Sequence, residues 1–63
     1  FKKMKVLRKV GGFELNYDPH MRMYNISNGD LLSFWFDGHY ADELLKMTDD
    51  DFLNECENEI TID

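Results

Sequence analysis

Apolar and polar residues alternate near the start of the chain, and this period of two predicts a first β-hairpin. The run Met4–Val10 is followed by Gly11-Gly12 and then by Phe13–Tyr17. Two consecutive glycines between such runs are typical of a two-residue hairpin turn, because both turn positions can adopt positive φ. Counting outward from this turn places Lys9 opposite Glu14, and the opposite charges support the register.

The same register predicts the face of the hairpin that enters the core. It gives three further pairs: Val10 with Phe13, Arg8 with Leu15, and Val6 with Tyr17. Side chains alternate between the two faces of a strand. The register therefore predicts one apolar face, made of Val6, Val10, Phe13, Leu15 and Tyr17.

Two later runs, Met21–Ile26 and Leu31–Phe36, predict a second hairpin around the four residues 27–30. The Asn28-Gly29 dipeptide within that loop is a strong short-range hairpin signal. The predicted pairs are Ile26 with Leu31, Tyr24 with Ser33, Met23 with Phe34, Arg22 with Trp35, and Met21 with Phe36. Both faces of this hairpin are largely apolar, whereas a strand with one wet face should alternate apolar with polar residues.

The period changes to a helical one after Asp37-Gly38. Residues His39–Met47 predict a short helix, and Thr48 with Asp51 resembles a capping box at the start of a second. The apolar positions Phe52, Leu53, Cys56 and Ile60 recur at helical spacing and form its inward stripe. The sequence therefore predicts a single α+β domain over residues 1–63. A four-stranded antiparallel meander over 1–36 is followed by one or two short helices in the acidic segment 37–63.

The size of the chain indicates how the fold is supported. A domain of 63 residues buries only about 60% of the surface that its unfolded chain exposes, so partner binding or self-association is expected, with a homodimer as the simplest form. Cys56 is the only cysteine, which excludes a disulfide within the chain. His20, His39 and Cys56 lack the short paired spacings of zinc sites. We expect no metal and no cofactor.

The charge of the chain is uneven and bears on its partners. The net charge is −6, yet residues 1–36 contain only three acids against six basic side chains. The basic side chains are Lys2, Lys3, Lys5, Arg8, Lys9 and Arg22. Residues 37–63 contain ten acids against Lys46 alone. This asymmetry disfavours nucleic acid and favours a protein partner with a basic surface. No apolar run approaches the roughly 18 residues of a membrane span, and a single cysteine without an export signal favours the cytoplasm.

The residues around Trp35 form the first candidate contact surface. Tryptophan, tyrosine and arginine are enriched at the residues that dominate binding energies in interfaces. One interpretation is that both faces of the sheet are covered within the chain. The other, which we favour, is that the helices cover the face of Phe34 and Phe36 and leave a patch made of Arg22, Tyr24, Ile26, Leu31 and Trp35. In that patch Arg22 would stack on the Trp35 indole or turn outward to a partner.

The acidic helix is the second candidate surface. Asp51, Glu55 and Glu59 are four residues apart, so they line one side of the helix. Like charges at that spacing destabilise a helix by about 0.2–0.5 kcal/mol per pair. Two interpretations are open: a solvated face that keeps the domain soluble, or an acidic surface that docks in a basic groove, as in proteins that imitate DNA phosphates.

The chain offers little for catalysis. His20 lies in a turn, His39 begins a helix, and Cys56 lies among carboxylates that disfavour its thiolate. We therefore predict a small non-catalytic protein-binding domain, of the kind with which phages and mobile elements inhibit host proteins in the host cytoplasm. The alternative is a sheet-type nucleic-acid-binding domain that uses Lys5, Lys9, Arg22 and Trp35.

Overall fold

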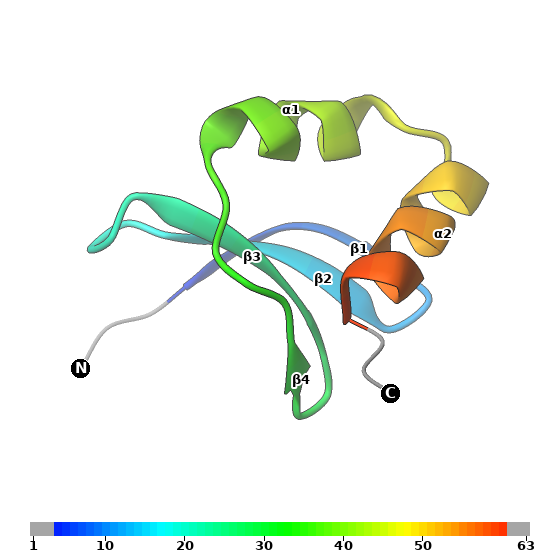
Figure 1. The fold of residues 1–63 in the computed structure, drawn as a ribbon, viewed down its shortest axis with the longest axis horizontal. Helices are drawn as coiled ribbons and strands as arrows, with labels where there is room; N and C mark the ends of the chain where they lie inside the picture. The colour runs from blue at the N-terminus through cyan, green and yellow to red at the C-terminus, as the bar shows by residue number, and fades with distance from the viewer. Residues whose placement is uncertain (1–3, 61–63) are drawn as a thin grey trace.

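The computed structural model describes residues 4–60 and has a four-stranded antiparallel sheet followed by two helices (Figure 1). The strands lie in sequence order across the sheet: β1 (Lys5–Val10), β2 (Phe13–Asp18), β3 (Met23–Asn28) and β4 (Leu31–Leu32). They are followed by helices α1 (Gly38–Lys46) and α2 (Asp49–Ile60). The predicted α+β meander is confirmed. Lys2 and Lys3, two of the predicted basic side chains, lie outside the described residues.

The core lies between one face of the sheet and the two helices. Leu15 of β2 and Ile26 of β3 face each other in the sheet register, and both are fully buried. They belong to one cluster of buried residues: Phe13, Leu15, Ile26, Leu44, Phe52, Cys56 and Ile60. The predicted inward stripe of α2 therefore packs on the sheet.

Two helices form because each has its own N-terminal cap. The Asp37 carboxylate accepts hydrogen bonds from the backbone N–H groups of His39 (3.1 Å) and Tyr40 (3.3 Å) at the start of α1. The Thr48 hydroxyl accepts one from the backbone N–H of Asp51 (3.2 Å) at the start of α2. Such side-chain oxygens satisfy N–H groups that have no partner within the helix. The predicted N-cap role of Thr48 is confirmed.

The first hairpin turns where the sequence predicts it. Gly11 and Gly12 both have positive φ, 55° and 89°. Lys9 lies opposite Glu14, with Nζ and Oε2 3.6 Å apart. Two further predicted pairs are also formed: Val10 with Phe13 and Arg8 with Leu15.

The register of this hairpin shifts at its far end. Between Arg8 and Val6 the strand contains one extra residue, Leu7, so Val6 lies opposite Asn16 and not opposite Tyr17. An extra residue in one strand reverses the alternation of every position beyond it. Val6 is 51% exposed as a result, and its predicted place in the core is wrong.

The second hairpin is tighter than predicted. Its turn consists of Gly29 (φ 63°) and Asp30, so Asn28 pairs with Leu31 and Ser27 pairs with Leu32. The predicted four-residue loop, and with it the pairing of Ile26 with Leu31, is wrong. A glycine at the first central position allows a two-residue turn, and the strands can then pair right up to it.

The chain leaves the regular ladder after β4. The Ser33 backbone N–H donates to the Ile26 carbonyl (2.8 Å), and Phe36 and Tyr24 exchange two backbone hydrogen bonds (2.8 and 2.9 Å). Ser33 and Phe36 are three residues apart in sequence, whereas Ile26 and Tyr24 are two apart. One extra residue is therefore accommodated at Phe34–Trp35, in the manner of a bulge.

Candidate partner-binding surface

Four large apolar side chains lie exposed in one stretch at the edge of the sheet, and we call them the β4-edge patch. The exposed fractions are 51% for Leu31, 58% for Leu32, 89% for Phe34 and 38% for Trp35. Phe34 has the highest value among the large apolar residues that the structure describes. Burying a phenylalanine side chain is worth about 1.5–3 kcal/mol relative to leaving it in water. Its exposure therefore indicates a surface that another molecule can cover.

Ser33 holds the backbone that presents Phe34. Its hydroxyl accepts a hydrogen bond from the Ile26 backbone N–H (2.8 Å) and donates one to the Phe34 carbonyl (2.9 Å). In a regular ladder a backbone carbonyl would accept from Ile26. The hydroxyl takes its place, and the chain can turn outward at Phe34 without leaving a buried N–H group unpaired.

The predicted division of the sheet faces is wrong. Ile26 is fully buried, and Tyr24 and Phe36 pack against the core cluster, so the helices cover the face that we expected to be open. The two-residue turn and the extra residue at Phe34–Trp35 together place Phe36 opposite Tyr24, where the prediction placed Ser33, and the extra residue brings Phe36 to the face of Tyr24. Of the predicted patch, Arg22, Leu31 and Trp35 are exposed. Phe34, expected under the helices, is the most exposed member.

The predicted pair of Arg22 and Trp35 does not form in the sheet. Arg22 lies in the turn before β3 with φ 60°, and its backbone N–H donates to the Asp18 carbonyl (2.7 Å). A non-glycine residue in this region usually marks a turn. Because β3 begins at Met23, Arg22 has no cross-strand partner in the ladder.

Arg8 is the structurally important residue that the sequence reasoning missed. Its guanidinium donates to the Leu44 carbonyl (2.7 Å) at the end of α1 and to the Asp49 carboxylate (3.0 Å) at the start of α2. It also lies over the Phe52 ring, 4.6 Å from the centroid. The signal was present in the register, which placed Arg8 opposite Leu15 on the core face.

The acidic residues of α2 are partly engaged within the fold. The Tyr40 hydroxyl donates to Glu55 Oε2 (2.6 Å) and lies 3.4 Å from Glu59 Oε2. Burial and these two carboxylates raise the pKa of Tyr40 above its ordinary value. Glu55 and Glu59 thus share one side of α2, and that side faces α1. Asp51 lies exposed at the other end of the helix.

Tyr40 connects these carboxylates to the edge of the sheet. Its ring meets the Phe36 ring edge-on, with centroids 4.9 Å apart. Phe36 follows the β4-edge patch in the sequence, and its backbone pairs with that of Tyr24 in β3. The Tyr40 side chain therefore lies between the carboxylates of Glu55 and Glu59 and the Phe36 ring at the end of the patch.

The cysteine and the possible metal ligands give no sign of a reactive centre. Cys56 is fully buried, and burial together with the nearby Glu55 raises the pKa of its thiol to about 11, although Arg8 acts in the opposite direction. The thiol therefore stays protonated at neutral pH, and the thiolate is the nucleophilic form. Among residues 4–60, no group of three or more His, Cys, Asp and Glu side chains is placed to hold a metal ion.

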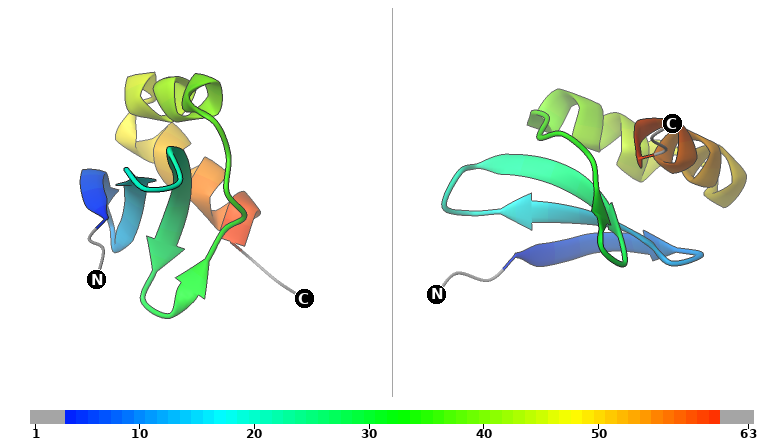
Figure 2. Two further views of the ribbon diagram at one scale, coloured as in Figure 1. Left: turned by 90° about the vertical axis from the view of Figure 1, so that its left-hand side faces the viewer. Right: turned by 60° about the horizontal axis from the view of Figure 1, so that its bottom comes forward.

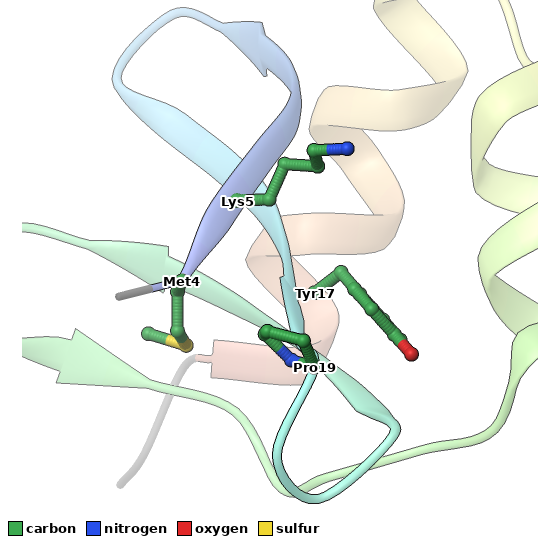
Figure 3. Close-up of a pocket in the computed structure, with 4 residues that line it drawn as sticks. All are labelled: Met4, Lys5, Tyr17 and Pro19. Atoms are coloured by element: carbon green, nitrogen blue, oxygen red, sulfur yellow. The ribbon is translucent and has the colours of Figure 1, made fainter. Parts of the chain in front are cut away.

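A hollow of about 440 Å³ lies where the edge strand β1 begins and β2 ends (Figure 3). It is lined by Met4, Lys5, Tyr17 and Pro19, and most of its wall is hydrocarbon. All but the half-buried Tyr17 are exposed. Small-molecule sites usually enclose their ligand and direct a few polar groups at it. This hollow is open and lies at the β1 side of the sheet, whereas the β4-edge patch lies at the other border.

Comparison with protein-family models, with curated proteins and with solved structures gives no match in any of the three. No helix in the described part of the chain is long and apolar enough to cross a membrane. The function is therefore inferred from the surfaces and contacts of the chain itself.

Proposed function

We propose that this chain is a small non-catalytic protein-binding domain that uses the β4-edge patch as its contact surface. In this role it occupies a site on a larger protein, as an inhibitor or an adaptor. The observation that carries the proposal is the exposure of Phe34, 89%, in a segment that also exposes Leu31, Leu32 and Trp35. Aromatic side chains in such positions are the anchors that supply most of the affinity of protein interfaces.

The hydrogen bonding of Ser33 supports this role. An anchor binds more tightly when it is held in its bound position before the partner arrives, because less freedom is lost on binding. The Ser33 hydroxyl fixes the Phe34 backbone through its carbonyl (2.9 Å). The side chain is therefore presented from a held backbone and not from a loose loop.

The charged groups of the sheet favour a protein over a nucleic acid as the partner. Of the three basic side chains on β1, Arg8 is bonded to Asp49 and to a helix carbonyl and Lys9 is paired with Glu14, which leaves the exposed Lys5. Phosphate binding needs several free cations on one face. The altered pKa values also do not favour catalysis, since both Tyr40 and Cys56 are held in their protonated forms.

Site-specific crosslinking tests the proposal. A photoreactive benzoylphenylalanine at position 34, introduced into the otherwise unchanged chain, should crosslink to one defined protein in cells of the native host. The matched control is the same group at Leu45, a residue of α1 that is 43% exposed. We expect the crosslink from position 34 only, and its loss when unlabelled wild-type domain competes. Equal crosslinking from both positions contradicts the proposal, and so does salt-sensitive binding of labelled DNA or RNA.

A further inference from the structure

We infer that the partner presents an extended segment that pairs with the outer edge of β4 and carries lysine or arginine at its flanks. This inference rests on the proposed function and specifies the partner that the β4-edge patch recognises. It follows from three properties of the edge: its outward backbone groups, its apolar side chains on both faces, and the charge at its two ends.

The backbone of β4 has an outward-facing donor and acceptor. Leu31 pairs with Asn28 across a two-residue turn, and the Ser33 N–H points back to the Ile26 carbonyl. In an antiparallel ladder successive residues direct their backbone groups alternately toward and away from the neighbouring strand. The N–H and C=O of Leu32, between Leu31 and Ser33, are therefore directed away from β3, and β4 is the last strand of the sheet.

The apolar side chains lie on both faces of this edge. Leu31 shares a face with its partner Asn28, and Leu32 shares the opposite face with its partner Ser27. Both leucines are more than half exposed. A partner that docks flat on one face would cover only one of them. A strand laid along the edge covers both, because its own side chains alternate in the same way.

The charged side chains at the two ends of this edge are acidic. No lysine or arginine occurs in residues 23–45, a stretch that includes β3, β4 and α1 up to the residue before Lys46. The chain runs from the tip of the second hairpin up to α1 (Figure 1). The exposed Asp30 lies in the hairpin turn, and the exposed Asp37 caps α1. Complementary charge at an interface steers association and selects the partner. The flanks of the bound segment should therefore be basic.

A second copy of this chain fits the edge poorly. A second copy would bring the same acidic residues, Asp30 and Asp37, and the same net charge of −6 to this edge. Like charges directly opposite each other destabilise a strand pair. The homodimer predicted from the sequence stays a prediction, and it is not the occupant that we assign to this edge.

Selection from a peptide library tests the inference. A yeast-displayed library of random ten-residue peptides is sorted against the immobilised full domain. We expect the enriched sequences to alternate apolar and other residues and to carry lysine or arginine near both ends. The best enriched peptide, titrated by NMR, should shift the Leu32 amide more than any amide of α2. No enrichment, enrichment of acidic or neutral peptides, or shifts centred on α2 would overturn the inference.

Two chemical controls separate strand pairing from general attraction between opposite charges. A version of the selected peptide with N-methyl groups on alternate amides should bind at least about tenfold more weakly, because it cannot donate to the edge. Replacing Asp30→Asn and Asp37→Asn together should weaken binding severalfold more than Asp42→Asn with Asp50→Asn. The asparagine at position 37 keeps an oxygen to cap α1. Equal effects of the two double variants contradict the inference.

The outcome for this edge can be separated from the outcome for the proposed function. If position 34 crosslinks to a protein while no peptide is enriched, the binding function stands and the strand chemistry falls. If the domain sediments as a dimer at 10 µM and Leu32→Ser makes it monomeric, the second copy is the occupant and the inference is wrong.

Discussion

The two edges of the sheet differ in nearly every property that governs whether an edge accepts another strand. β1 and β4 form the two borders of the sheet (Figure 2). β1 carries Lys5 and Lys9 and bulges at Leu7, and both features discourage pairing with a foreign strand. Residues 31–36 at the other edge contain no charged side chain. The contrast teaches that β1 is protected against strand addition and β4 is not, which is the arrangement that the proposed binding through β4 requires.

The largest effect should come from removing the bonds that join β1 to the two helices. Arg8→Ala removes the hydrogen bonds to Leu44 and Asp49 and the contact with Phe52. Hydrogen bonds that involve a charged group are worth about 1.5–3 kcal/mol, and a contact between an arginine and an aromatic ring adds about 0.5–2. We expect the free energy of unfolding in urea to fall by about 3 kcal/mol. Lys9→Ala, which breaks only the exposed pair with Glu14, should cost less than about 1 kcal/mol. A comparable loss in both variants would mean that Arg8 has no special role.

A charged residue of the kind found on β1 can be introduced on β4, where it should prevent pairing with another strand. Leu32→Lys gives β4 a lysine of the kind that protects β1, and it places an uncompensated charge where the partner binds. We expect affinity for the protein crosslinked at position 34 to fall about 30-fold, equivalent to about 2 kcal/mol. Unfolding in urea should be unchanged, since the side chain is exposed. Leu45→Lys on α1 is the control and should leave affinity intact. If affinity survives in Leu32→Lys, the open edge is not the contact surface.

The hydrogen bond from the Ile26 N–H to the Ser33 hydroxyl, at the point where the chain leaves the ladder, can be tested by substitution. Ser33→Ala leaves the Ile26 N–H without its acceptor. A buried donor left unpaired costs about 1–3 kcal/mol. We expect about 1.5 kcal/mol less stability, and faster hydrogen exchange of the Ile26 amide. Ser33→Thr keeps the hydroxyl and should restore the slow exchange. Slow exchange in the alanine variant would show that another group accepts from Ile26.

The smallest effect concerns alkaline pH and the link between α1 and α2. The raised pKa of Tyr40 means that the folded state holds its proton more tightly than the unfolded state. This stability is complete below pH 10, the ordinary pKa of tyrosine, and is lost as pH rises above it. Tyr40→Phe should cost under about 1 kcal/mol at pH 7 and should make the fall of stability above pH 10 shallower. Stability curves at pH 7–11 measure this, with Tyr17→Phe as the control. Parallel curves for wild type and Tyr40→Phe would contradict it.

The fold could be predicted from the sequence where one strong local signal fixes a turn. Gly11-Gly12 and the Lys9–Glu14 pair gave the first turn and its nearest pairs. The bulge at Leu7 could not be foreseen, because Val6 and Leu7 are both apolar and either one could face the core. Thr48 was recognised as a cap because its hydroxyl acts within its own helix turn.

The candidate surface was predicted less well than the fold. Leu31 and Trp35 were expected to be exposed, and they are. The helices cover the face of Tyr24 and Ile26, which was expected to be open. The residue gained after Ser33 brings Phe36 to that same face, and Phe34, which was expected beneath the helices, is exposed. A serine hydroxyl that replaces a backbone carbonyl has no periodic signature, so alternation alone cannot reveal the change of face.

The bonds of Arg8 have a consequence for the order of folding. They join residues 36 and 41 positions apart, whereas the meander is built from neighbouring strands. Contacts between distant residues carry a larger loop-closure cost, and they tend to form after local ones. The hairpins should therefore assemble first, and the arginine should lock the helices onto them late. Its loss should then speed unfolding severalfold and leave the refolding rate nearly unchanged, so the lifetime of the native state depends on this side chain.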